Sequence, residues 1–397
     1  MKQKESSIKK NISKYYWFSF IRELMFIMPV IYIFWQSNGL NLTQIMLLQS
    51  IFAIGIVFLE VPTGVIADKV GRKQSLICGT IASLMGYLVY SFGTTFAHFA
   101  IAEIILAAGL TFVSGADAAF VYDSLKQEKK EKNYKKVWGN AKSIDYSSQM
   151  LSAIVGSAIA VYSLRAGWYM ISVAMFIAML IAFTFKEPKH YKKLKETSYL
   201  KHTLESFKKV GTNKNLLFLV LFHATLAVVL KISLWFYQPY MLKAGIPMLY
   251  FGIAWASLNI FSIAGSKLAH RVEGFLGVNR SLWLIILLST LSLAFMSYWI
   301  VLFGMIFIFA QQFARGFAPP VVLDYTNKHL SSEKRATLLS IQSFAGGLSF
   351  AIFAPLYGWI ADAYSLSTAL IATAASFLVI FIILMIWKKT LDKKKGG

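Results

Sequence analysis

Several ionisable side chains lie inside long apolar segments of this sequence. Removing a charge from water is costly, so such residues are candidates for function by default. They are Arg22, Glu23, Glu60, Glu103, Asp117 and Asp145 in the first half of the sequence, and His223, Lys231 and Arg315 in the second. The first half therefore offers carboxylates that can exchange a proton, and the second half offers cations that can bind a negative group.

The segments that carry these residues have the composition of a membrane protein. The 397 residues are 57% hydrophobic and 15% charged, whereas soluble proteins carry about 25% charged residues. A membrane-spanning helix needs roughly 20 apolar residues. Segments of this kind lie near 15–36, 43–67, 74–94, 97–125, 138–163, 167–185, 215–238, 247–269, 281–299, 301–326, 336–363 and 366–387. The predicted fold class is an all-α membrane protein with twelve transmembrane helices.

The positive charges lie mostly between the apolar segments. The net charge is +22, and 35 of the 40 Lys and Arg residues fall in alternate connecting segments, whereas the other connections hold only Arg165 and Lys243. Because cytoplasmic loops are rich in Lys and Arg, both termini are expected in the cytoplasm, beside the anionic inner leaflet of the membrane. The cations form short runs rather than a basic domain, so no nucleic-acid partner is expected. The one cysteine, Cys78, fits no disulfide or metal spacing, and no metal site is predicted.

One long basic connection divides the chain into two halves. We expect a six-helix bundle over 1–185, a cytoplasmic linker over 186–214, and a second six-helix bundle with a basic tail over 215–397. Within the linker, Leu200, Leu204 and Phe207 have helical spacing among lysines. This pattern predicts either a helix on the inner leaflet or a solvated linker.

The two halves share a weak internal repeat. A shift of 201 residues pairs Gly64 with Gly265, Gly115 with Gly316, and Asp123 with Asp324. Three matches at one offset indicate an ancient duplication, which predicts two parallel six-helix halves related by pseudo-twofold symmetry.

The connection between the second and third spans reads GVIADKVGRK over 64–73. Its fixed residues are Gly64, Asp68, Lys69, Gly71, Arg72 and Lys73. This stretch resembles the loop signature of the major facilitator superfamily (MFS), and the twelve spans, the basic linker and the repeat extend the resemblance over the whole chain. LEVPTGVIAD and SGADAAFVYDSL look similar to bacterial efflux permeases. Two departures concern coupling: Thr111 stands where many members have Arg, and GSAIA lacks the proline of the antiporter signature.

The resemblance implies that the loop signature is part of a gate. Asp68 would complement the start of span eleven near Ala336, Arg72 would pair with Asp123, and Glu60 would belong to the same assembly. These contacts would latch the two halves on the cytoplasmic side. The alternative is that Lys69, Arg72 and Lys73 only fix the topology. Ala269 replaces the aspartate in the second copy, so that loop should latch weakly.

The resemblance also places spans one, four, seven and ten around a central cavity. Arg22, Glu23, Asp117 and Asp145 are then expected to meet in one polar cluster with a net charge of −2. We predict that Asp117, paired with Arg22, binds the coupling proton, with Glu23 as the second choice. The alternative is a static ion-pair network that fixes helix packing.

In the second half, Arg315, Lys231 and His223 are predicted to bind substrate. Trp235 and Phe18 would add aromatic surface. These cations would either bind a negative group of the substrate or balance the charge of the carboxylates across the cavity.

The predicted function is secondary active transport of a small molecule by alternating access, most simply as a monomer. Proton-coupled export of drugs or toxic compounds is the first choice, and ion-coupled uptake of a metabolite, with anionic metabolites included, is the alternative. A membrane enzyme or sensor is the remote alternative, since no catalytic cluster is evident. No cofactor is expected, and the coupling ion is expected to be H⁺.

Overall fold

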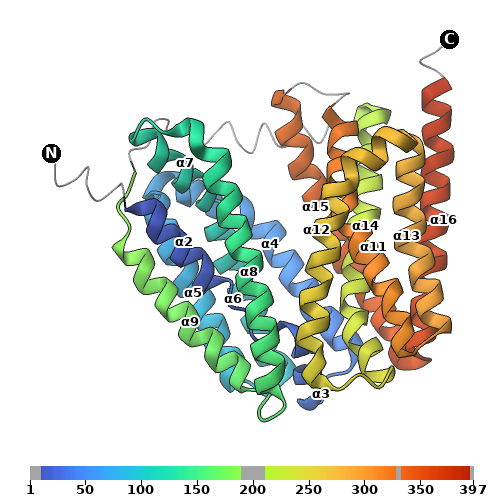
Figure 1. Cartoon of the computed structure of the whole chain (residues 1–397), viewed down its shortest axis with the longest axis horizontal. Coiled ribbons are helices and arrows are strands. Elements are labelled where there is room, and N and C mark those ends of the chain that lie inside the picture. The colour runs from blue at the N-terminus through green and yellow to red at the C-terminus, as the bar shows by residue number, and fades with distance from the viewer. Residues whose placement is uncertain (1–9, 189–210, 328–331, 394–397) are drawn as a thin grey trace. The chain divides into compact units, whose positions relative to one another are not determined.

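The computed structural model describes residues 10–188, 211–327 and 332–393, and in these ranges the chain is helical with no strands (Figure 1). Helices form because a backbone in lipid must satisfy its N–H and C=O groups within its own segment. Among the described residues, ten helices are long and apolar enough to span a membrane. The all-α fold predicted from the apolar segments is confirmed.

The helical elements are α2 (Asn11–Arg22), η1 (Met28–Val30), α3 (Ile31–Ser37), α4 (Leu42–Val70), α5 (Arg72–Phe92), α6 (Phe96–Ser114), α7 (Asp117–Gln127), η2 (Glu131–Asn133), α8 (Tyr134–Ala160), α9 (Ala166–Thr184), α11 (Lys214–Lys243), η3 (Met248–Tyr250), α12 (Phe251–Leu276), α13 (Val278–Tyr298), η4 (Leu302–Gly304), α14 (Met305–Asn327), α15 (Ser332–Ala363) and α16 (Leu366–Lys393).

Two of the twelve predicted spans differ from the other ten for physical reasons. The first span is interrupted between α2 and α3. The fifth span, α8, has 27 residues and is long enough, but it carries Lys142, Asp145 and several serines. Both exceptions concern helices that hold ionisable residues.

The described helices belong to two compact units. The N-terminal unit comprises Met1–Leu40, Ile51–Glu196 and Met248–Ala256, and the C-terminal unit comprises Asn41–Ser50, Thr197–Pro247 and Ser257–Gly397. Each unit thus includes a short segment from the other half of the sequence. The linker positions Leu200, Leu204 and Phe207 lie outside the described residues.

Specific contacts hold these short segments. In the C-terminal unit, the Asp362 carboxylate accepts the backbone N–H groups of Leu42 (3.0 Å) and Thr43 (2.7 Å), and so caps the start of α4. In the N-terminal unit, Ser157 Oγ donates to the carbonyl of Leu249 at 3.1 Å. The start of α4 therefore packs in the C-terminal unit, and the segment Met248–Ala256 at the start of α12 packs in the N-terminal unit.

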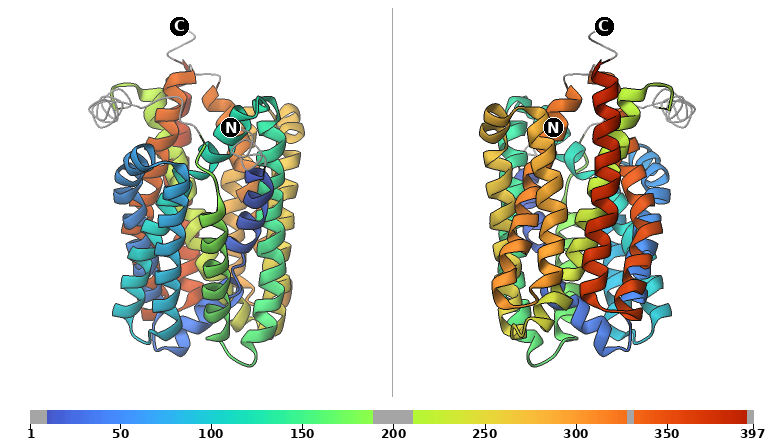
Figure 2. Two further views of the ribbon diagram at one scale, coloured as in Figure 1. Left: turned by 90° about the vertical axis from the view of Figure 1, so that its left-hand side faces the viewer. Right: turned by 90° about the vertical axis from the view of Figure 1, so that its right-hand side faces the viewer.

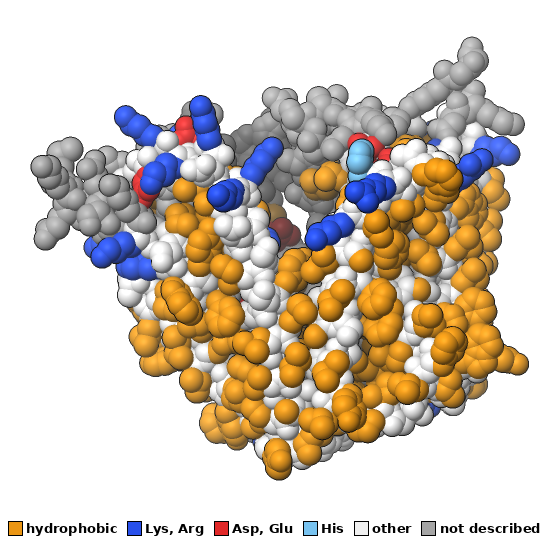
Figure 3. Space-filling view, viewed as in Figure 1, with side chains coloured by type: hydrophobic (Ala, Val, Ile, Leu, Met, Phe, Trp, Pro, Cys, Tyr) orange, Lys and Arg blue, Asp and Glu red, His pale blue; other side chains and the backbone are white. Residues whose placement is uncertain are grey.

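The side chains of each unit are arranged as a membrane protein requires. On the visible face, most Lys and Arg side chains of each unit lie at one end of the helices, and hydrophobic side chains are the most common coloured type over the rest (Figure 3). The helices of each unit run side by side along one direction, as both views of Figure 2 show.

The core of the N-terminal unit is aromatic. The Tyr90 ring stacks on Trp168 (centroids 4.1 Å apart) and on Phe99 (5.1 Å). The Tyr90 hydroxyl donates to Glu103 at 2.5 Å, and Glu103 is 5% exposed. Glu103, which lies near the predicted outer end of span four, is therefore a buried core acid that accepts a hydrogen bond.

Candidate functional site

The first span is broken next to its ionisable residues. Helix α2 ends at Arg22, and regular helix resumes only at η1 and α3. Helix α8 supports the break: Ser148 Oγ donates to the carbonyl of Phe20 at 2.5 Å, and the N–H of Met25 donates to Ser152 Oγ at 3.0 Å. A side chain at Gly156 would overlap the carbonyl of Phe26. Ser148, Ser152 and Gly156 recur every four residues, so one face of α8 satisfies the backbone that the break frees.

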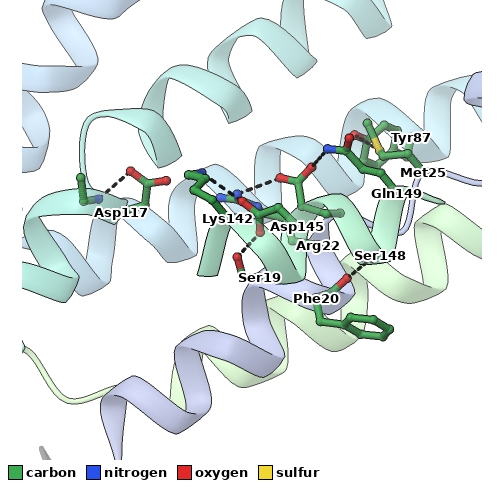
Figure 4. Close-up of polar contacts among 12 residues, drawn as sticks. Ser19, Phe20, Arg22, Met25, Tyr87, Asp117, Lys142, Asp145, Ser148 and Gln149 are labelled. Carbon is green, nitrogen blue, oxygen red and sulfur yellow. Dashed lines mark hydrogen bonds and ion pairs between the residues drawn. The ribbon is translucent and has the colours of Figure 1, made fainter. Parts of the chain in front are cut away.

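The charges at this break form short contacts (Figure 4). Arg22 pairs with Glu23 at 2.8 Å, and the second Glu23 oxygen accepts from the Gln149 amide at 2.8 Å. Asp145 pairs with Lys142 at 2.9 Å and accepts the hydroxyl of Ser19. Charge-assisted contacts of this kind are stronger than neutral ones, so they fix the side chains of α2 and α8 together.

The fourth span is broken as well. Helix α6 ends at Ser114 and α7 begins at Asp117. The Asp117 carboxylate accepts the N–H of Ala118 at 2.6 Å, so it satisfies one of the free N–H groups in the first turn of α7. Asp117 is 8% exposed and forms no ion pair with the described residues, but it interacts electrostatically with Arg22 and Lys142.

We call Arg22, Glu23, Asp117, Lys142 and Asp145 the carboxylate cluster. The structure brings together the four residues that the sequence placed in one polar cluster and adds Lys142, which the sequence analysis assigned to a connecting segment. The expected net charge of −2 is therefore wrong. Two cations face three carboxylates, which leaves a net charge of −1.

The C-terminal unit has a partly open cavity of about 240 Å³. Its described lining is His223, Leu226, Ala227, Leu230 and Lys231 from α11, and Arg315, Ala318, Pro319 and Val322 from α14. Three of the predicted substrate-binding residues therefore share one cavity.

The two predicted aromatic contacts lie elsewhere. Phe18 is fully buried, packs edge to face on Phe185 (centroids 5.4 Å apart) and lies under the Arg22 guanidinium. It therefore supports the carboxylate cluster rather than offering free aromatic surface. Trp235 lies on α11 and is not among the described residues that line the cavity.

The loop signature between α4 and α5 forms a compact turn. Gly71 has φ of +107°, which a side chain would oppose, so this glycine permits the reversal from α4 into α5. Arg72 pairs with Asp68 at 2.8 Å, inside the signature itself, whereas the sequence analysis expected Asp123 on α7. Glu60 and Lys69, which both lie on α4, are exposed.

A residue outside the signature completes this turn. The Glu187 carboxylate accepts the backbone N–H groups of Arg72 (2.7 Å) and Lys73 (2.8 Å) at the start of α5. The sequence analysis assigned Glu187 to the linker. The contact predicted near Ala336 falls where the structure describes no side chains, so the latch stays a prediction.

Similarity to known proteins identifies the class. The family model of the Major Facilitator Superfamily matches residues 16–306, so the chain belongs to this superfamily. The chain is 24% identical to the uncharacterised MFS-type transporter YxaM of Bacillus subtilis, over 94% of both chains. It is also 24% identical to an uncharacterised MFS-type transporter of Methanocaldococcus jannaschii, over 46% of this chain and 47% of that protein.

Solved structures agree on the fold. The nucleoside transporter NupG matches with a TM-score of 0.80 at 15% identity, covering 95% of this chain and 99% of that one. A bacterial homologue of the human lysosomal transporter Spinster matches with a TM-score of 0.71 at 16% identity, covering 98% and 96%. The protein is therefore a multi-pass MFS transporter of small molecules, and the resemblance carried by the loop signature is confirmed.

Proposed function

We propose that this transporter couples the movement of its substrate to protons at the carboxylate cluster. The supporting observation is the charge balance at the two helix breaks, where three carboxylates meet two cations. Charge that is left unbalanced away from water is costly, and binding one proton removes it. The net charge of the cluster is thus −1 without the proton and zero with it.

Asp117 is the carboxylate that takes the proton. Glu23 and Asp145 each form an ion pair, with Arg22 and Lys142 respectively, whereas Asp117 interacts with these cations only at longer range. A proton on Asp117 therefore breaks no ion pair. Because Asp117 begins α7 at a break in the fourth span, its charge state acts on a point where the helix can bend.

Two directions of transport are compatible with this coupling. Uptake with protons requires that the empty and the fully loaded transporter reorient, and export by exchange requires that a proton and the substrate replace each other.

The proposed coupling is tested by separating exchange from accumulation. A susceptibility screen of deletion and overexpression strains first supplies a substrate. In proteoliposomes, Asp117→Asn should retain counterflow of labelled substrate, because exchange needs no net proton movement, and should lose accumulation driven by a pH gradient. Glu131→Gln, at an exposed acid of η2, should retain both. Gradient-driven accumulation that survives in Asp117→Asn rejects the coupling role.

A further inference from the structure

The cavity between α11 and α14 has an unusual distribution of charge. Lys231 and Arg315 are exposed at their positions on these helices, and both line the cavity. They interact with each other electrostatically, as like charges. Neither forms an ion pair with a carboxylate of the described residues, and no described lining residue is acidic. The two charges therefore add in one small space.

Packing of the neighbouring helices fixes the helix positions that carry the two cations. Next to Arg315, a side chain at Gly316 would overlap the carbonyl of Ser262 on α12, so α14 and α12 cross in close contact there. The Lys231 ammonium lies 5.5 Å from the centre of the Phe350 ring of α15, at cation–π distance. Bringing two like charges into one pocket costs energy, and a bound anion offsets that cost.

A third polar group lies at the same cavity. His223 is one of the lining residues, and its Nδ1 is buried without a hydrogen-bond partner among the described residues. This nitrogen has no accessible surface, so the pocket meets other atoms of the His223 side chain.

We propose that the cavity binds a small organic anion through a carboxylate or phosphate group held by Lys231 and Arg315. This inference rests on the proposed function, because it names the substrate class of the same transporter. A guanidinium binds such groups in a bidentate manner, and an ammonium adds a point charge. His223 lines the same pocket beside the two cations.

The walls limit the rest of the ligand. Leu226, Leu230, Pro319 and Val322 present only apolar side chains to the pocket, so the body of the anion is apolar and carries few hydroxyl groups. The pocket of about 240 Å³ is partly open, so it accommodates a small acid such as a short-chain dicarboxylate or an aromatic acid without excluding a longer one. A neutral, hydroxyl-rich solute finds no matching partners along these walls.

An anionic substrate also gives the proton site and the anion site complementary roles in transport. A membrane potential that is negative inside opposes the entry of an anion, and a proton carried in the same direction cancels that charge. The carboxylate cluster supplies the proton site and the cationic cavity supplies the anion site. Among the two directions, this combination favours uptake by proton symport.

The binding site is tested by calorimetry on the purified transporter without any gradient. The probes are succinate, benzoate, glycerol 3-phosphate and inorganic phosphate, with succinamide as the uncharged analogue. At least one anion should bind, more weakly at high salt, and succinamide should not. Lys231→Gln and Arg315→Gln should each weaken binding about tenfold or more, whereas Lys243→Gln, at the end of α11 outside the cavity, should change nothing. Lys231→Arg should restore binding if the charge matters rather than the fold.

Several outcomes overturn the proposal. They are binding of succinamide as tight as that of succinate, unchanged binding in Arg315→Gln, or no binding by any anion of the panel. Asp117→Asn keeps its cavity and should bind the anion normally. If Asp117→Asn binds the anion normally and still accumulates substrate along a pH gradient, the coupling role alone is rejected. If the unsubstituted transporter binds no anion of the panel, but Asp117→Asn loses gradient-driven accumulation, the anion site alone is rejected.

Discussion

The two units arise from repeated halves of the sequence, yet they treat their first and fourth helices differently. In the N-terminal unit the first helix is broken after Arg22 and the fourth between Ser114 and Asp117. In the C-terminal unit the corresponding helices, α11 and α14, are continuous through the described residues. The breaks therefore belong to one copy of the repeat and not to the architecture itself.

The carboxylates occur in the unit that has the helix breaks. At the offset of 201 residues that relates Gly64 to Gly265, the counterparts of Glu23, Asp117 and Asp145 are Ala224, Ala318 and Gly346. The C-terminal unit instead carries the cations of its cavity on unbroken helices. A break supplies free backbone groups and close neighbours for a carboxylate, so the N-terminal unit is suited to protons and the C-terminal unit to an anion.

The largest effect should come from removing the support of the first break. Gly156→Leu places a side chain where the carbonyl of Phe26 lies, so α8 must separate from the broken segment and its two serine hydrogen bonds are lost. A backbone clash costs more than the about 1–3 kcal/mol of an overpacked core. We expect little folded protein in membranes, measured by size-exclusion chromatography after detergent extraction.

The matched control for this change lies on the same helix. A side chain at Gly139 meets nothing within 4 Å, so Gly139→Leu should fold normally and gain helix propensity. If Gly156→Leu and Gly139→Leu gave equal yields of monodisperse protein, the close approach of α8 to the break would not be required.

The second prediction concerns the loop signature and its copy. Asp68 is partly exposed and paired with Arg72, whereas its counterpart Ala269 is 1% exposed. Ala269→Asp should therefore bury an unpaired carboxylate and destabilise the C-terminal unit by about 3 kcal/mol. Asp68→Ala should cost only about 0.5 kcal/mol, because half-exposed ion pairs contribute little. Thermal unfolding of both variants measures the difference.

His270→Asp tests whether burial or charge causes this loss, because His270 is the exposed neighbour of Ala269. It should unfold near the wild-type temperature. Equal destabilisation by His270→Asp and Ala269→Asp would show that the loop rejects negative charge generally, and that the difference between the copies does not come from burial.

The sequence predicted the helices well because twenty apolar residues leave a backbone in lipid few alternatives. The turn at Gly71 was equally clear from its residues. The break after Arg22 was not, because the apolar stretch LMFIMPV looks like uninterrupted span. A signal was nevertheless present in α8, where Ser148, Ser152 and Gly156 recur every four residues in a helix that is otherwise long enough to span.

The partners of the charges were harder to predict because they come from distant parts of the chain. Glu23 and Gln149 are 126 residues apart, and Glu187 lies 115 residues from Arg72. Lys142 follows a basic run and was counted with the connection before it, yet its ammonium reaches Asp145 one turn later in α8. Hydrophobic periodicity places a residue on a helix, but it does not show which helix lies opposite.

The smallest predicted effect concerns the end of the sixth span, where the units again differ in sign. Glu187 caps α5 through the N–H groups of Arg72 and Lys73, whereas its counterpart Lys388 lies over the ring of Tyr325 at 5.2 Å. Glu187→Gln keeps one acceptor but removes the negative charge that favours a helix N-terminus. We expect a loss of about 1 kcal/mol, measured as a small decrease in Tm and faster hydrogen exchange at the start of α5.

Glu131→Gln is the control for this substitution, because Glu131 is an exposed acid of η2 and caps no described helix. Its exchange rates should match the wild type throughout α5. If Glu187→Gln also left the exchange of the first turn unchanged, the carboxylate would not stabilise α5, and Gly71 would have to hold the turn alone. If exchange accelerates only in that turn, Glu187 acts locally, as expected of a cap that belongs to one unit.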